Sequence, residues 1–306
     1  MDQYKTSKDL EIFEMNYIDN THLQEVCQLR QPILFDFLPV DPIFHLYTGS
    51  DADVNVKDTN KYYTSTSSDV DPVVVTYDCA NQLFANDENS HFFSEDNSEF
   101  LENTGFMKHI VDYNELLAPN YYTIHTEYDY LFGSPNVITP LRHHTHYRRF
   151  LYVLSGKIRI KMTSWKNTPY INNIRDYENY DFRSPVSPEK LFLDKKIKFL
   201  DIDVVKGLIL YIPPYLWYSI QYVDADSRVL SISYTTAMNA ISNAHHLGLY
   251  WLQQHNIVKM PTNTKEVDKE VDKEPDKELD KEPEQSIEIV EDKIDEHEID
   301  LSHGTI

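Results

Sequence analysis

The segment around the Ser155-Gly156 dipeptide limits the fold of this chain more than any other. Residues 150–154 form a continuous apolar run, and Ser155-Gly156 supplies a tight turn. Residues 157–162 then alternate strictly between basic and apolar side chains, with Ile158 on the apolar side. Alternation of this kind is typical of a strand with one buried face. The segment therefore predicts an antiparallel hairpin, and a fold built largely from sheets.

The rest of the chain repeats this signal in short pieces. Two helices are predicted, one over residues 20–27, opened by a capping box of Asn20-Thr21 with Gln24, and one over residues 237–254 that closes the globule. Residues 50–105 are rich in Asp, Asn, Ser and Thr and predict a loop-rich insertion. Many short strands with few helices favour a mainly β fold, either a sandwich or a barrel. Strands are predicted at residues 33–37, 73–77, 197–204, 208–212 and 229–234.

The C-terminal residues 259–306 cannot form a packed core. A tetrapeptide of the type Lys-Glu-Val-Asp repeats from residue 265, and residues 265–300 hold six lysines against 17 acidic residues. Their net charge of −11 is half of the −22 of the whole chain. So few apolar groups under one dominant charge sign cannot offset the chain entropy lost on folding. This region is predicted to be a disordered acidic tail.

Composition excludes several classes of function. The strongly negative charge disfavours a nucleic-acid partner, because phosphate contacts need clustered basic residues. Only seven glycines and no Gly-rich phosphate motif disfavour a nucleotide-binding loop. No apolar run approaches the roughly 18 residues of a membrane span, and residues 1–14 form a polar extension. With only Cys27 and Cys79, the chain is expected in a reducing, intracellular compartment, the cytoplasm or the nucleus.

Two remote segments carry the most specific pattern. They are Thr139-Pro-Leu-Arg-His-His-Thr-His-Tyr147 and Gly207-Leu-Ile-Leu-Tyr-Ile-Pro-Pro-Tyr-Leu-Trp217-Tyr218. Their Thr-Pro, Gly, Pro-Pro and Trp positions resemble the cupin-like JmjC family, whose enzymes are Fe(II)- and 2-oxoglutarate-dependent oxygenases. The resemblance covers about residues 15–255. It implies a domain over residues 15–258 that is a double-stranded β-helix, a cupin or jelly-roll barrel, with flanking helices.

The resemblance also implies where iron ligands would stand, and the first pair is not intact. Family members hold iron with a His and a carboxylate two residues apart, plus a distant His. Counted from Thr139-Pro140, the pair falls on Arg142 and His144. Counted back from the Ser155-Gly156 turn, it falls on His143 and Thr145. Neither register supplies the carboxylate.

The other positions of the implied site are changed as well. The distant His falls on Tyr218, and the residue that grips 2-oxoglutarate falls on Ile158. Arg149 stands where the family often has a neutral amide, and Trp217 is a packing residue of the signature. An arginine cannot lose its proton to become a ligand, and its charge opposes a divalent cation. The candidate pocket residues are Thr139, Arg142, Arg149, Ile158, Trp217 and Tyr218.

Three further interpretations of the first segment stay open. In one, the segment is a polar strand end whose histidines only form local hydrogen bonds. His144 and His146 would point to one face of a strand, so together with Tyr218 they would suit zinc, copper or nickel. A basic group in the same segment would instead recognise an anion, with the neighbouring histidines, and consists of Arg142, Arg148 and Arg149.

Two hypotheses for the function follow. The preferred one is a JmjC/cupin-like protein that has lost Fe(II)/2-oxoglutarate catalysis, a pseudoenzyme that needs no cofactor and acts as a binding or scaffold module. The alternative is an active protein hydroxylase or demethylase that binds Fe(II) and 2-oxoglutarate. Its rearranged metal site would use His143, His144 or His146 with a remote acid, such as one from residues 85–102.

Protein partners are expected, and membranes are not. Ser286 to Val290 is an apolar patch in the acidic tail that resembles SUMO-interacting motifs, which add a strand to a partner's sheet. Its apolar side chains are Ile287, Ile289 and Val290. The family often dimerises through C-terminal helices, so residues 237–254 would allow a homodimer.

Overall fold

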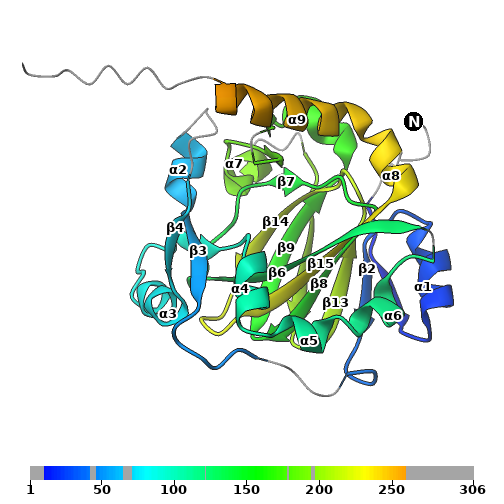
Figure 1. Cartoon of the computed structure of the whole chain (residues 1–306), viewed down its shortest axis with the longest axis horizontal. Helices are drawn as coiled ribbons and strands as arrows, with labels where there is room; N and C mark the ends of the chain where they lie inside the picture. Colours follow the sequence, from blue (N-terminus) through cyan, green and yellow to red (C-terminus); the bar gives the residue numbers. More distant parts are fainter. Residues whose placement is uncertain are drawn as a thin grey trace, which may run out of the picture. The chain divides into compact units, whose positions relative to one another are not determined.

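Two β-sheets, of nine and six strands, form the centre of the structure (Figure 1). The structure is a computed structural model that describes residues 10–41, 46–64, 71–120, 122–177, 179–193 and 197–259. The predicted acidic tail, apart from Lys259, lies outside these residues, and so does the segment with Ile287, Ile289 and Val290.

The larger sheet has the strand order β1-β2-β13-β8-β15-β6-β5-β3-β4. Only β1 and β2 pair in parallel; the other neighbours in this order are antiparallel. Its strands are β1 (Phe13–Asn16), β2 (Ile33–Asp36), β3 (Asp53–Asp58), β4 (Val73–Thr76), β5 (Phe92–Ser94), β6 (Thr123–Gly133), β8 (Arg148–Ser155), β13 (Leu208–Ile212) and β15 (Arg228–Thr236).

The smaller sheet has the order β10-β11-β7-β14-β9-β12. Its strands are β7 (Arg142–His143), β9 (Lys157–Thr163), β10 (Ile174–Asp176), β11 (Asp181–Arg183), β12 (Leu200–Val205) and β14 (Trp217–Tyr222). In neither sheet does the last strand of the described order pair with the first, so both sheets are open. The expectation of a closed barrel is therefore wrong: two open sheets face one another.

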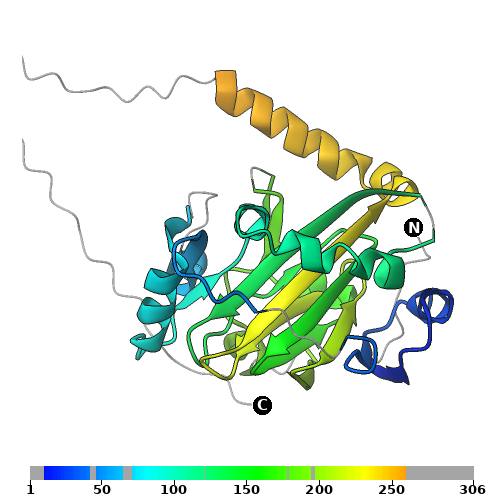
Figure 2. The same cartoon turned by 60° about the horizontal axis from the view of Figure 1, so that its bottom comes forward.

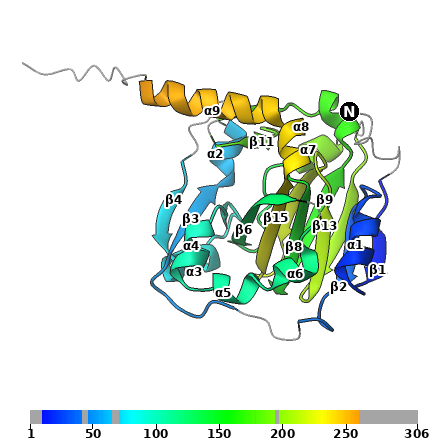
Figure 3. The ribbon, with the colours of Figure 1, turned by 45° about the vertical axis from the view of Figure 1, so that its right-hand side comes forward.

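Helices cover the larger sheet and make the fold mixed α/β rather than mainly β. Figures 1 and 3 show α4, α5 and α6 in front of its central strands. The prediction of flanking helices is confirmed, but the described helices exceed the two expected. They are α1 (Asn20–Cys27), α2 (Thr59–Thr64), α3 (Tyr77–Ala85), α4 (Ser98–Asn103), α5 (Met107–Ile110), α6 (Tyr113–Leu117), α7 (Pro188–Leu193), α8 (Ala237–Ser242), α9 (Ala244–Lys259) and the 3-10 helix η2 (Trp165–Tyr170).

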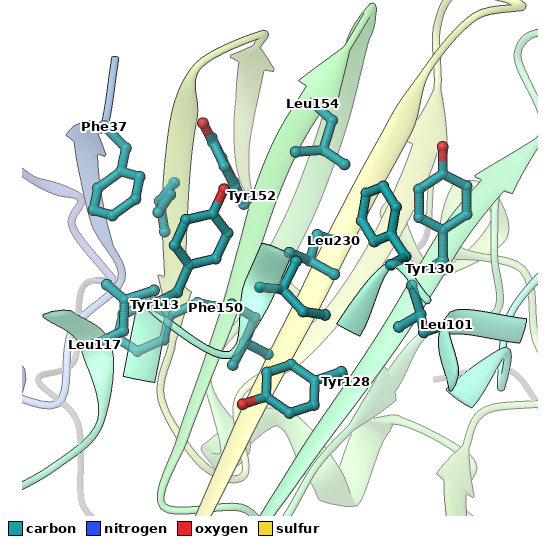
Figure 4. Packing of buried hydrophobic residues seen from close by; sticks show 14 of the residues in the cluster. Phe37, Leu101, Tyr113, Leu117, Tyr128, Tyr130, Phe150, Tyr152, Leu154 and Leu230 are labelled. Carbon is teal, nitrogen blue, oxygen red and sulfur yellow. The ribbon is translucent and has the colours of Figure 1, made fainter. Parts of the chain in front are cut away.

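The central strands of the larger sheet are buried on both faces, and β8 shows how the sequence encodes this. Phe150, Tyr152 and Leu154 point toward the helices, where they pack with Tyr113 and Leu117 of α6 (Figure 4). The residues between them on β8, Leu151 and Val153, pack against the smaller sheet. Because successive strand residues face opposite sides, a strand covered on both sides must be apolar throughout.

The smaller sheet has one face in water, which explains the alternation in β9. Ile158, Ile160 and Met162 are fully buried between the sheets. The basic residues between them form an ion-pair ladder with Asp201 and Asp203 of β12. Exposed pairs of this kind add little stability, so the burial of the apolar face holds the strand in place.

The predicted hairpin is wrong in its pairing. The turn at Ser155-Gly156 is present, but β8 belongs to the larger sheet and β9 to the smaller one. Gly156 has φ of +64°, and a Cβ there would lie 2.8 Å from the backbone of Ser227. The turn thus carries the chain across from one sheet to the other, which a flat hairpin turn would not do.

Residues 50–105 are not a loop-rich insertion. They contain the short elements β3, α2, β4, α3, β5 and α4. The strands β6 and β14 also escaped prediction. The first helix does span residues 20–27, but Asp19 caps it by accepting a hydrogen bond from the backbone of His22, at 2.8 Å. Gln24 instead accepts a hydrogen bond from Arg148 at 3.2 Å.

The predicted C-terminal helix is divided at Asn243 into α8 and α9. Figure 2 shows α9 running outward from α8. Met238, Ile241 and Leu252 of these helices are exposed. These helices therefore do not close the globule as expected. No helix within the described ranges is both long and apolar enough to cross a membrane.

Replacing Phe150 with alanine tests the helix-facing core. The ring is fully buried and lies against Phe35, Tyr211 and Tyr234. We expect Phe150→Ala to lower the free energy of unfolding by about 3–5 kcal/mol in urea denaturation. The matched control Phe13→Ala removes an exposed ring from the edge strand β1 and should cost under about 1 kcal/mol. Equal losses for the two variants would contradict this assignment of the core.

Candidate functional site

A cavity of about 460 Å³ opens beside the smaller sheet's strand β7 and reaches the inner face of the larger sheet. Three groups of side chains form its wall. The first comes from the β7–β8 connection and the strands around it: Pro140, Arg142, His143, His144, Thr145, His146, Arg149, Leu151, Tyr218 and Ser231. The second comes from β3, α2, β5, β6 and their loops: Lys57, Tyr62, Pro72, Phe93, Glu95, Asp96, Glu127, Asp129 and Leu131. The third is the run Asn179 to Arg183 at β11.

Most of the residues predicted for the site meet in this cavity, and three of them lie elsewhere. Thr139 hydrogen bonds to the backbone of Ile220 at 3.0 Å and serves strand pairing. Ile158 is part of the core between the sheets. Trp217 packs in a separate apolar cluster and donates a hydrogen bond to Thr168 at 2.9 Å. The predicted residues that do line the cavity are Arg142, Arg149, Tyr218, His143, His144 and His146.

Consecutive residues of one segment face the cavity because β7 is only two residues long. Arg142 pairs with Tyr218 across the sheet, and regular strand pairing resumes at Arg148. The intervening loop is held by its backbone. The amide of Tyr215 donates to the His144 carbonyl at 2.9 Å, and Asn239 donates to the Thr145 carbonyl at 2.9 Å. The loop therefore presents its side chains without the alternation of a strand.

Arg142 forms a two-pronged ion pair with Glu95. Both nitrogens at the end of the guanidinium contact the two carboxylate oxygens, and Glu95 is only 2% exposed. Burial alone would lower the pKa of Arg142, but the Glu95 charge raises it well above its ordinary value. Arg142 is thus fully charged, and its ion pair with Glu95 closes one side of the cavity.

Arg149 is held by neutral groups. It donates to Ser233 Oγ at 2.9 Å and to the Tyr218 hydroxyl at 2.7 Å. Its remaining nitrogen, Nη2, lies 3.9 Å from Glu127, beyond hydrogen-bond distance. Arg148, expected in the same basic group, points to the opposite face and donates to the Leu117 carbonyl at 3.0 Å. The predicted three-arginine anion site is therefore wrong, because neighbouring strand residues face opposite sides.

The three histidines are uncharged; His144 is buried, and His143 and His146 are half-buried. Burial lowers the pKa of His143 to about 3. Burial and then the Arg149 charge lower the pKa of His146 to about 4 and that of His144 well below its ordinary value. His144 Nε2 donates to the Ile212 carbonyl at 3.1 Å, so its Nδ1 carries the lone pair. His143 stacks on Phe182, with ring centroids 5.0 Å apart.

Carboxylates of the opposite wall were largely missed from the sequence. Asp129 accepts hydrogen bonds from the backbones of Asp96 and Asn97, at 3.0 and 2.7 Å, and so holds the loop that carries Glu95. Burial and then the Asp96 charge raise the pKa of Asp129 to about 7. Lys57 pairs with Asp96, and the Lys57 charge lowers the pKa of the Asp96 carboxyl. The sequence signal that could have indicated Asp129 is its position as an acidic residue between two tyrosines, Tyr128 and Tyr130.

These donors do not fit an iron site. In the part of the chain that the structure describes, no three His, Cys, Asp or Glu side chains are arranged to hold a metal ion. His144 and His146 do lie together, with ring centroids 5.7 Å apart, and Glu127 is 3.4 Å from His146. However, the positive potential of Arg149 that disfavours a proton on both rings also disfavours a divalent cation between them.

No protein-family model matches the chain, and no curated protein sequence matches it. The likeness to the cupin-like JmjC family therefore stays a prediction.

Acid should destabilise the protein through its neutral histidines. Unfolded histidine binds a proton near pH 6.5, whereas the folded rings of His143 and His146 do so only at about 3 and 4. The unfolded chain therefore binds more protons, and stability that is complete above pH 6.5 is lost as the pH falls below it. We expect the free energy of unfolding of His144→Gln to fall less steeply with decreasing pH than that of the wild type, by about 1.4 kcal/mol per pH unit. Urea unfolding between pH 7 and pH 5 measures this slope.

Asp129 gives a matched test of opposite sign. Its folded pKa of about 7 exceeds the unfolded value, so the folded chain binds the extra proton and gains stability as the pH falls through 7. The free energy of unfolding of Asp129→Asn should therefore fall more steeply with decreasing pH than that of the wild type. A decline that neither variant changes would contradict both assignments.

The Arg142–Glu95 pair should behave as one buried unit. Glu95→Gln leaves the guanidinium uncompensated and should cost about 3–5 kcal/mol of unfolding free energy. The double variant Glu95→Leu with Arg142→Met removes both charges and should lose less than either single variant, as measured in urea denaturation. Strictly additive losses would show that the two side chains act independently.

Proposed function

We propose that this chain is a metal-independent binding module on a double-stranded β-helix, a pseudoenzyme that resembles the cupin-like JmjC family. The strand order supports this fold. The chain crosses between the sheets so that the order β6-β15-β8-β13 faces the order β7-β14-β9-β12. Such alternation between two facing sheets is the arrangement of a jelly roll.

One observation carries the functional part of the proposal. In the register counted from Thr139-Pro140, the first and last metal positions of the resemblance are Arg142 and Tyr218, which are paired across β7 and β14 and are both committed to other contacts. Arg142 is bound to Glu95, and the Tyr218 hydroxyl accepts a hydrogen bond from Arg149 at 2.7 Å. The site therefore keeps its cavity and fills the places of its iron ligands with a salt bridge and a phenol.

The cavity suits a small polar ligand. Its volume of about 460 Å³ is within the range of small-molecule sites, which lie between about 300 and 1,000 Å³. Its wall combines aromatic rings with fixed charges, as binding sites for polar organic molecules do. The binding role needs neither Fe(II) nor 2-oxoglutarate, since Ile158, at the position of the co-substrate's anchor, is buried in the core.

A second candidate, an active hydroxylase or demethylase with a rearranged metal site, is favoured by one contact. Glu127, a carboxylate outside the motif segments, lies 3.4 Å from His146 in the cavity that His144 also lines. Two imidazoles and one carboxylate are the ligand set of such oxygenases. This candidate requires Arg149 to leave the neighbourhood of Glu127, which it contacts at 3.9 Å.

Scaffold roles belong to the same proposal. The apolar patch of Ile287, Ile289 and Val290 would bind a protein partner as an added strand. A homodimer would use the exposed apolar residues of α8 and α9, among them Met238 and Trp251.

Metal analysis separates the two candidates. We expect protein purified and then equilibrated with Fe(II) to hold far less than one iron per chain and to release no succinate from 2-oxoglutarate, because Arg149 opposes the cation. Elemental analysis and a succinate assay measure this. Stoichiometric iron with succinate release, both abolished by Glu127→Ala, would establish the oxygenase instead.

A further inference from the structure

The charged side chains of the cavity wall are mostly paired with one another. Three cations among the described lining residues each contact a carboxylate, in the pairs Lys57–Asp96, Arg142–Glu95 and Arg183–Asp181. A further carboxyl, that of Asp129, is 7% exposed and accepts two backbone hydrogen bonds. Arg149 and Glu127 remain, and a cation beside Arg149 or an anion beside Glu127 would meet a charge of its own sign. The wall therefore favours a ligand without net charge.

The space between Arg149 and Glu127 suits a hydroxyl group. Nη2 of Arg149 and Oε1 of Glu127 are 3.9 Å apart, too far for a hydrogen bond between them. The other two nitrogens of Arg149 donate to Ser233 and Tyr218. A guanidinium only donates and a carboxylate only accepts, whereas a hydroxyl oxygen does both. One hydroxyl can thus accept from Arg149 and donate to Glu127, which neither an ammonium nor a carboxylate group can do.

A second acceptor in the wall lacks a donor. His144 lines the cavity and is 5% exposed, and its Nδ1 has no hydrogen-bond partner among the described residues. Because Nε2 donates to the Ile212 carbonyl, Nδ1 holds a lone pair. The rings of His144 and His146 are 5.7 Å apart, and His146 lies 3.4 Å from Glu127. A second hydroxyl of the same molecule can therefore reach His144, since each hydrogen bond adds about 2.8 Å to the span.

Aromatic rings supply the apolar part of the wall. Tyr62, Tyr180 and Phe182 line the cavity. The C–H groups of a polyol pack on such rings while its hydroxyls turn to the polar side chains. The cavity volume of about 460 Å³ is large enough for a molecule of monosaccharide size.

We propose that the cavity binds a neutral polyol of monosaccharide size, with one hydroxyl bridging Arg149 and Glu127 and a second donating to His144 Nδ1. This inference rests on the proposed metal-independent binding function and names its ligand class. Binding of this kind leaves the ion pairs of the wall intact. It also gives the buried imidazole nitrogen the donor that it lacks, and a buried acceptor without a donor is costly.

Ligand-observed NMR titration of the full chain, with a chelator present, tests the inference. The polyol probes are glucose, galactose, mannose and myo-inositol, and the charged controls are 1,4-diaminobutane and succinate. We expect at least one polyol to bind, and both charged molecules to bind more weakly than that polyol. Tightest binding of myo-inositol would indicate a cyclitol as the ligand, and tightest binding of a hexose would indicate a sugar.

Two variants at the proposed bridge locate the binding site. Glu127→Gln should weaken polyol binding by about tenfold, the loss expected when a charged acceptor becomes neutral. Arg149→Met removes the donor and its charge, so it should weaken polyol binding and strengthen diamine binding. The control Glu102→Gln removes a carboxylate from an exposed position on α4 outside the cavity wall and should leave polyol affinity unchanged. The thermal midpoint of each variant reports whether it is folded.

Three results would overturn the inference: no binding of any of the four polyols up to about 100 mM, tighter binding of the diamine or of succinate than of every polyol, or equal polyol affinity in wild type and Glu127→Gln. Failure of the parent proposal has a separate readout. Iron content and succinate release from 2-oxoglutarate, measured on the same preparation without chelator, report that failure whatever the polyols do.

Discussion

The ion pair between Arg142 and Glu95 is the contact on which the cavity depends. It joins β7 of the smaller sheet to the loop after β5 of the larger one, and Asp129 fixes that loop through two backbone amides. A buried charge is tolerated only with a well-placed partner, since an isolated one costs several kcal/mol. Each side chain therefore holds the other in the wall. The same pair removes a cation and a carboxylate from any chemistry inside the cavity.

How far the sequence predicts the fold depends on where the partners of each segment lie. The apolar faces of β8 and β9 can be predicted from the sequence, because the direction of alternate side chains is a local property of a strand. Which strands pair is not local, so the turn at Gly156 was expected to close a hairpin although it connects two sheets. The polar composition of residues 50–105 predicts loop. Their short elements form because they pack on the core around Phe100 and Phe132. Their own sequence carries little periodicity.

The candidate site shows the same contrast between local patterns, which the sequence reveals, and contacts between remote residues, which it does not. Arg142, Tyr218 and the histidines were found because they stand in motif segments of recognisable spacing, and the cavity does bring them together. A remote acid from residues 85–102 was anticipated in general terms, and Glu95 and Asp96 now line the wall. That Glu95 would neutralise Arg142 instead of serving as a ligand depends on a contact across 47 residues of sequence. No local pattern encodes such a contact.

The residues at the implied metal positions, Arg142 and Tyr218, are each tied to a neighbouring side chain in the cavity wall. A histidine at position 142 would leave Glu95 buried without its cation. A histidine at position 218 would remove the hydroxyl that accepts from Arg149, which lies 3.9 Å from Glu127. The first change would thus leave an unpaired charge in a buried place, and the second would leave an Arg149 donor without its acceptor. Under the proposed metal-independent function, an iron site at this cavity would therefore require a concerted change of several residues rather than a single substitution.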